Sequence, residues 1–185
     1  MTRMGFVGVV LACATAIGCT ALVVAGPLDP PAGPVGSTYK TLAEVEPRIA
    51  INATNTPGDA DSLFKITQPG SYYLTGNVTG VASKVGIEIA ASGVTIDLGG
   101  FELVGVGSGS FSGIVTSAPA LESVTVRNGT IRAWGRTGID FFNNSPLGCR
   151  IERVGAGNNT LNGISVRSGC VIVDCVAWGN GSAGF

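Results

Sequence analysis

The side chains in the last third of the chain that could contact a charged ligand are arginines. Residues 127–185 carry six arginines and three acids, a net charge of +3, and no lysine follows position 126. The six are Arg127, Arg132, Arg136, Arg150, Arg153 and Arg167. We favour ordinary surface arginines, and the alternative is an outward strip with Arg127, Arg132 and Arg150 that binds an acidic polysaccharide.

The 185-residue chain contains no histidine, which excludes Ser-His-Asp triads and metal sites that need an imidazole ligand. Its net charge of −1 argues against a nucleic-acid-binding protein. Glu88 and Asp140 occupy equivalent outward positions two coils apart, about 10 Å, and inverting glycosidases hold two carboxyls about 6.5–9.5 Å apart. Val115 lies between them, so we favour a solvated strand face. We predict no catalytic residue, no metal site and no cofactor.

Asp97, Arg127 and Glu152 alternate in sign at equivalent positions of three successive repeats. The alternation favours an ion ladder between neighbouring strands over a grip on a charged ligand, because opposite charges then face each other. Trp134 and Trp178 occupy matching places in the repeat, each followed by glycine. An exposed indole would be a platform for a sugar ring and a buried one would fill the interior, so both interpretations stay open.

Three cysteines follow the N-terminal segment: Cys149, Cys170 and Cys175. Equivalent positions in adjacent coils place Cys149 and Cys170 about 4.8 Å apart, within the disulfide range. We favour two stacked thiols that pack as small apolar side chains, with a disulfide as the alternative that export would permit. The six Asn-x-Ser/Thr sequons start at Asn52, Asn77, Asn128, Asn143, Asn158 and Asn180. We favour a structural role at turns for these asparagines over glycosylation.

An internal repeat organises these residues. Gly-Ile pairs begin at positions 86, 113, 138 and 163, and Gly184-Phe185 stands where a fifth would begin. Each pair opens a short run of alternating apolar and polar residues, and two further short segments follow, which is typical of half-buried strands. Three short strands per repeat predict an all-β parallel solenoid of about four to five coils, about 4.8 Å apart. One predicted interior column is Val94, Val124, Cys149 and Cys170, and another is Ile96, Val126, Ile151 and Ile172.

The segments GIEIAASGVTIDLGGFELVG and VTVRNGTIRAWG resemble repeats of secreted bacterial proteins with the right-handed parallel β-helix of pectate lyases. The resemblance covers roughly residues 70–185 and implies that fold with an N-terminal cap. It implies little about activity, because this fold hosts many functions. Pectate lyases would show an acid cluster for calcium, and polygalacturonase-like enzymes would show paired Asp motifs, Gly-His-Gly and Arg-x-Lys. The sequence contains none of these.

Residues 1–25 are predicted to be a signal peptide, because Arg3 precedes the uncharged run from Phe6 to Ala25. An uncleaved anchor and lipidation at Cys13 are the alternatives, and all three export the domain. Residues 26–37 form a Pro/Gly-rich linker, residues 38–85 a cap and first coil that starts with a helix near 41–44, and residues 86–185 the repeats. The pattern stops within a coil, so we expect a truncated member of a longer family or a second chain over that end.

These features together predict an exported, non-catalytic β-helix module of unknown ligand, which is either a surface protein or a protein that binds an extracellular polysaccharide. The alternative is a polysaccharide lyase or glycoside hydrolase truncated before its active site. We expect no nucleic-acid partner and no membrane contact beyond the signal peptide.

Overall fold

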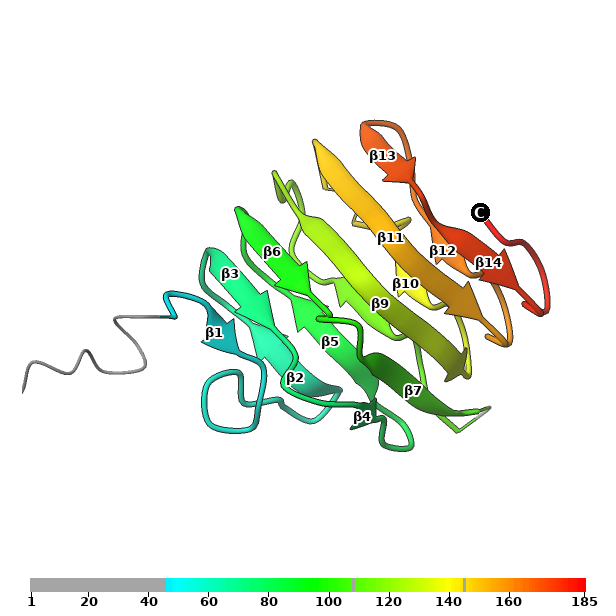
Figure 1. Ribbon diagram of the computed structural model, residues 1–185, viewed down its shortest axis with the longest axis horizontal. Coiled ribbons are helices and arrows are strands. Elements are labelled where there is room, and N and C mark those ends of the chain that lie inside the picture. Colours follow the sequence, from blue (N-terminus) through cyan, green and yellow to red (C-terminus); the bar gives the residue numbers. More distant parts are fainter. Residues whose placement is uncertain (1–45, 108, 145) are drawn as a thin grey trace, which may run out of the picture. The chain divides into compact units, whose positions relative to one another are not determined.

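The computed structural model describes residues 46–107, 109–144 and 146–185 (Figure 1). The expected signal peptide, the linker and the helix near 41–44 lie outside these residues. Within them the chain is all-β, with no helix and therefore no helix long and apolar enough to cross a bilayer. The strands stack in parallel as a β-solenoid of about five turns, as the repeat predicts.

The strands form two parallel sheets, one of nine strands and one of five. The nine-stranded sheet contains β1 (Ile49–Ala50), β3 (Gly70–Tyr73), β4 (Val78–Thr79), β6 (Val94–Asp97), β7 (Glu102–Gly107), β9 (Thr125–Trp134), β11 (Cys149–Gly157), β13 (Cys170–Val173) and β14 (Val176–Trp178). The five-stranded sheet contains β2 (Ser62–Ile66), β5 (Val85–Ile89), β8 (Ile114–Thr116), β10 (Ile139–Asp140) and β12 (Ile164–Ser165). In Figure 1, β3, β6, β9, β11 and β13 lie side by side in that order.

The predicted interior columns are present. Ile96, Val126 and Ile151 are direct neighbours on β6, β9 and β11, and Ile172 on β13 continues the column. Ile96, Val126 and Ile151 are fully buried, so apolar side chains stack on like side chains through the core. The second and third expected strands of a coil merge in β9 and β11, each of which runs on through a bend. The described part of the expected cap already carries β1–β4.

The Gly-Ile repeat reflects close approach between coils. A Cβ on Gly138 would lie 2.5 Å from the carbonyl oxygen of Gly163, and the same distance separates a Cβ on Gly163 from the carbonyl of Gly184. A Cβ on Gly86 or on Gly113 would lie equally close to the carbonyl oxygen of the next glycine in the column. The carbonyl of Gly163 also accepts a 3.0 Å hydrogen bond from Ile139 N–H, so it cannot move away without loss of this bond. Glycine is therefore needed here for space.

The bend within β9 and β11 depends on left-handed backbone. Asn128 and Arg153 both have positive φ, 58° and 51°, and they are adjacent in the stack, as Asp174 is in the next coil (52°). A second column of residues with left-handed backbone includes Asn158, whose φ is 54°. Asparagine tolerates this region better than most residues. For Asn128 and Asn158, this geometry confirms the role at turns that we favoured for the sequon asparagines.

The two tryptophans are not equivalent, which corrects the sequence-based alignment. Trp178 pairs with Gly157 and thus falls in the column of Arg132, two residues before Trp134. Trp134 is fully buried, and its indole N–H donates a 3.1 Å hydrogen bond to the Leu103 carbonyl. Trp134 fills the interior and cannot bind a ligand.

The sulfur atoms of Cys149 and Cys170 are joined in a disulfide, with 4.5 Å between the Cα atoms. The expectation of two stacked thiols is therefore wrong, although the predicted column is correct. The register brings the two positions face to face in adjacent strands, so the geometry satisfies the distance that a bridge requires. Cys175 remains a free cysteine.

Candidate functional site

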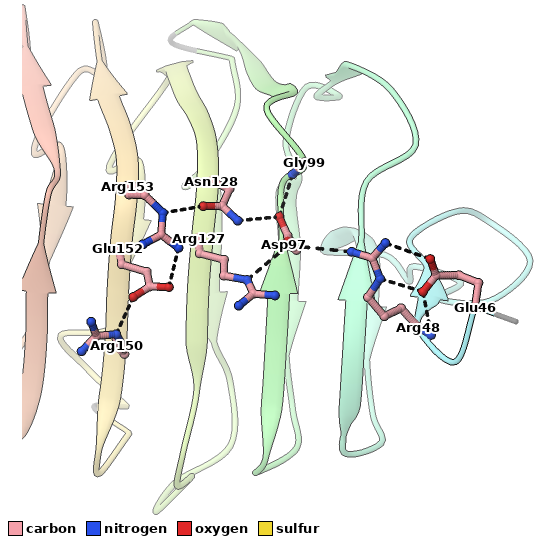
Figure 2. A network of polar contacts seen from close by, with 9 residues as sticks. All are labelled: Glu46, Arg48, Asp97, Gly99, Arg127, Asn128, Arg150, Glu152 and Arg153. Carbon is pink, nitrogen blue, oxygen red and sulfur yellow. Dashed lines mark hydrogen bonds and ion pairs between the residues drawn. The ribbon is translucent and has the colours of Figure 1, made fainter.

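Four arginines and the polar side chains that hold them follow the outer face of the nine-stranded sheet (Figure 2). We call this group the arginine strip; it contains Arg48, Arg127, Arg150 and Arg153 with Glu46, Asp97, Asn128 and Glu152. Asp97, Arg127 and Glu152 are direct neighbours on β6, β9 and β11. Their side chains point outward because residues 96, 126 and 151, one position earlier, point into the core.

Asp97 is the centre of the first half of the strip. It accepts hydrogen bonds from the Gly99 N–H (3.0 Å), from Asn128 Nδ2 (3.1 Å) and from Arg127 Nε (3.2 Å). Arg48 Nη1 approaches the same carboxylate at 3.8 Å. Burial opposes ionisation of Asp97, but the Gly99, Asn128 and Arg127 donors outweigh it and hold its pKa below the ordinary value. Asp97 is therefore an ionised, fixed partner of the arginines.

Glu152 is the centre of the second half. It accepts a 2.6 Å hydrogen bond from Arg150 Nε and a 2.8 Å hydrogen bond from Arg153 Nη2. The Arg150 bond is the main cause that lowers the pKa of Glu152, and Arg153 adds to it against the effect of burial. Arg153 Nε also reaches the neighbouring coil, where it donates to Asn128 Oδ1 at 2.8 Å.

The expected ion ladder forms only in part. Arg127 pairs with Asp97 on one side, but among the described residues it forms no ion pair with Glu152 on the other. The reason is that Glu152 is already bound by Arg150 and Arg153. Arg150 reaches Glu152 along the same strand face, and Arg153 reaches it from the left-handed bend.

The acids lie beneath the arginines. The side chains of Asp97 and Glu152 are each 11% exposed, whereas those of Arg127, Arg150 and Arg153 are 35%, 48% and 52% exposed. An approaching molecule therefore meets guanidinium groups first and carboxylates only below them. The strip as a whole carries four arginines and three acids, so its formal charge is +1.

The remaining predicted binding residues lie beyond the bend. Arg132 forms a two-bond pair with Glu102, with Nε to Oε1 at 3.1 Å and Nη2 to Oε2 at 2.8 Å. Trp178 is 40% exposed, and its ring covers the backbone of Gly155 and Gly157, where a Cβ would overlap it. Of the five residues predicted to bind ligand, the structure brings Arg127 and Arg150 into the strip. It places Arg132 and Trp178 in a separate column and Trp134 in the core.

Glu88 and Asp140 do occupy equivalent positions of the five-stranded sheet, with Val115 between them. Glu88 is only 7% exposed, and its Oε1 lies 2.7 Å from Lys65 Nζ. The expectation of a solvated glutamate is thus wrong at this position. Lys65 also contacts Asp59 at 2.7 Å, so the charge of Glu88 belongs to a structural ion cluster.

Sequence reasoning did not select Arg48, Asn128 and Arg153 for the site. Arg48 precedes the first clear repeat, and Arg153 lies directly after the predicted strand, where alternation no longer indicates direction. In the part of the chain that the structure describes, no three His, Cys, Asp or Glu side chains are placed to hold a metal ion. No family model matches the chain, and neither a curated protein nor a solved structure matches it.

Proposed function

We propose that this protein is an exported, non-catalytic β-solenoid module that binds an acidic polysaccharide through the arginine strip. The observation that carries the proposal is the layering of charge, with Asp97 and Glu152 at 11% side-chain exposure beneath arginines at 35–52%. The acids fix the guanidinium groups in place. Among the described residues, the terminal nitrogens of Arg127 and Arg150 make no hydrogen bond, so they remain available for carboxylates or sulfates, which arginine can bind with two parallel hydrogen bonds.

The repeat of the fold suits a polymer. Arg127 lies on β9, and Arg150 and Arg153 lie on the adjacent β11, so arginines of two neighbouring coils, about 4.8 Å apart, share this face. A chain with regularly spaced anionic groups can contact successive coils along the solenoid. Several weak charged contacts then act together, which raises the affinity over that of one contact.

Export is supported by two features. The Cys149–Cys170 disulfide needs an oxidising compartment to persist. The basic and apolar pattern of residues 1–25 is typical of a secretory signal. The resemblance of the repeats to secreted right-handed β-helix proteins of the pectate-lyase type agrees with both.

Trp178 is a proposed second contact, for a sugar ring beyond the bend. One face of its indole lies on the Gly155 and Gly157 backbone, and the residue is 40% exposed. The C–H groups of a pyranose pack on the electron-rich face of such a ring.

The test is retention of the protein on immobilised polygalacturonate, alginate and heparin, with elution by a salt gradient. We expect elution of the double variant Arg127→Gln/Arg150→Gln at clearly lower salt than wild type. The control is Arg136→Gln/Arg167→Gln, which removes the same charge away from the strip. Equal elution of the two double variants, or no retention of wild type on any column, contradicts the proposal. Release of new reducing ends from a polymer would favour the lyase or hydrolase alternative.

A further inference from the structure

Arg153 adopts a backbone conformation that its residue type disfavours. Its φ is 51°, in the left-handed region, whereas its neighbours in the same column are Asn128 and Asp174. Asn and Asp enter this region several-fold more often than other residues, because their short polar side chains bond to the local backbone. Ala133, at 60°, shows that a left-handed corner of this solenoid also forms without such a residue. The bend therefore tolerates arginine here without requiring it.

The conformation places the Arg153 side chain between two coils. Its Nη2 donates to Glu152 and its Nε to Asn128 Oδ1, both at 2.8 Å. At 52% exposure it is the most exposed arginine of the strip. Residues held in costly backbone regions cluster at functional sites, so the orientation points to a role outside the fold.

One acid, Glu152, lies beside Arg127 and Arg153: it is the register neighbour of Arg127 and pairs with Arg153 at 2.8 Å, so the three side chains together carry a net charge of +1. Arg127 uses its Nε for Asp97, on the far side, and its two terminal nitrogens have no partner among those residues. Asn128 separates the two guanidinium groups, with its oxygen toward Arg153 and its nitrogen toward Asp97. Figure 2 shows this arrangement, in which a neutral amide links Asp97 to Arg153.

We infer that Arg127 and Arg153 together bind one carboxylate of the polysaccharide, and that Arg153 determines the specificity for uronate-type units. The inference rests on the proposed function and names the anionic group that the strip selects. A planar carboxylate can accept hydrogen bonds from both guanidinium groups at once, which a neutral sugar cannot do with comparable strength.

The decisive variant is Arg153→Asn, because asparagine suits the left-handed backbone and stands at the equivalent position of the preceding coil. We expect its dissociation constant for trigalacturonate to rise about fivefold or more, since charge-assisted hydrogen bonds are lost. The melting temperature is expected to stay unchanged or to rise. Arg136→Asn, with the same charge change outside the strip, should alter the constant less than twofold. The methyl ester of trigalacturonate should bind wild type and Arg153→Asn equally weakly.

A double-mutant cycle with Arg127→Gln tests whether the two arginines share one anion. Arg127→Gln/Arg153→Asn is expected to weaken binding less than the product of the two single effects, because either loss already breaks the shared contact. Independent effects, or a twofold or smaller change for Arg153→Asn, overturn the subsite. A lower melting temperature of Arg153→Asn would show a structural role and overturn the subsite as well.

Column retention separates the subsite from the proposed function. If wild type is retained on polygalacturonate and Arg153→Asn is retained equally, the subsite fails and the proposed function stands. If wild type binds no acidic polymer, both fail.

Discussion

Replacement of Gly138 by alanine tests whether the Gly-Ile repeat exists because adjacent coils approach too closely for a side chain. The new Cβ would lie 2.5 Å from the Gly163 carbonyl oxygen and 2.9 Å from Asn159 Nδ2. The backbone of Gly138 is not left-handed, so the expected effect comes from the contact alone. To relieve it, the two coils must separate locally.

The size of the effect follows from the bonds that the separation breaks. Gly138 N–H donates to Asn162 O and Ile139 N–H to Gly163 O, both at 3.0 Å. Each such bond contributes about 1 kcal/mol, and disturbed packing of Ile139, which is fully buried, adds a similar amount. The lower entropy of alanine in the unfolded chain offsets about 0.4–1 kcal/mol. We expect a net loss of about 2–3 kcal/mol in the free energy of unfolding.

Urea unfolding followed by circular dichroism measures this loss, with Gly76→Ala as the matched control. No atom lies within 4 Å of a Cβ on Gly76, and its φ is not positive, so the control should lose no stability and gain about 0.4–1 kcal/mol from the lower entropy of the unfolded chain. A Gly138→Ala protein as stable as the control would refute the argument that space selects glycine in this column.

Three further results are expected. Joint replacement of Cys149 and Cys170 by alanine should lower the free energy of unfolding by about 3 kcal/mol, because the disulfide closes a loop with a sequence separation of 21. Thermal melts measure this loss. An unchanged melting temperature would show that the disulfide constrains the unfolded chain little. The pKa of Asp97 is held below its ordinary value of 3.8, so its contribution to stability is present above about pH 4 and disappears as the pH falls through the lower pKa of the folded state. The melting temperature of Asp97→Asn should therefore fall less steeply below pH 4 than that of wild type. Parallel curves of melting temperature against pH for the two proteins would contradict this assignment. Acrylamide should quench the fluorescence of Trp178 but not that of Trp134, which is fully buried. Bound polysaccharide should protect Trp178 from the quencher. Unchanged quenching upon binding would exclude Trp178 as a contact.

The architecture could be predicted from the sequence because its determinants are local and repeated. Alternation within each short run decides which residues point inward, and the recurring Gly-Ile pairs indicate which residues of successive coils become neighbours. Ile96, Val126 and Ile151 therefore stack as the pattern indicates, and Cys149 faces Cys170. The same register placed Asp97, Arg127 and Glu152 in one outward row.

The candidate site depended on features that no local pattern carries. The alignment of Trp134 with Trp178 failed because it followed the shared Trp-Gly pair. The register runs without a shift from β9 through β11 to β14 and aligns Trp178 with Arg132, two residues before Trp134.

The pairing of Glu152 with Arg153 depends on a left-handed bend that alternation does not describe, whereas Arg150 reaches Glu152 from two residues earlier on the same strand face. Alternation along the sequence thus determined the interior of this protein. The bends of the tertiary structure decided how the arginines of its outer face are arranged, because the partners of a long charged side chain depend on where the backbone turns it.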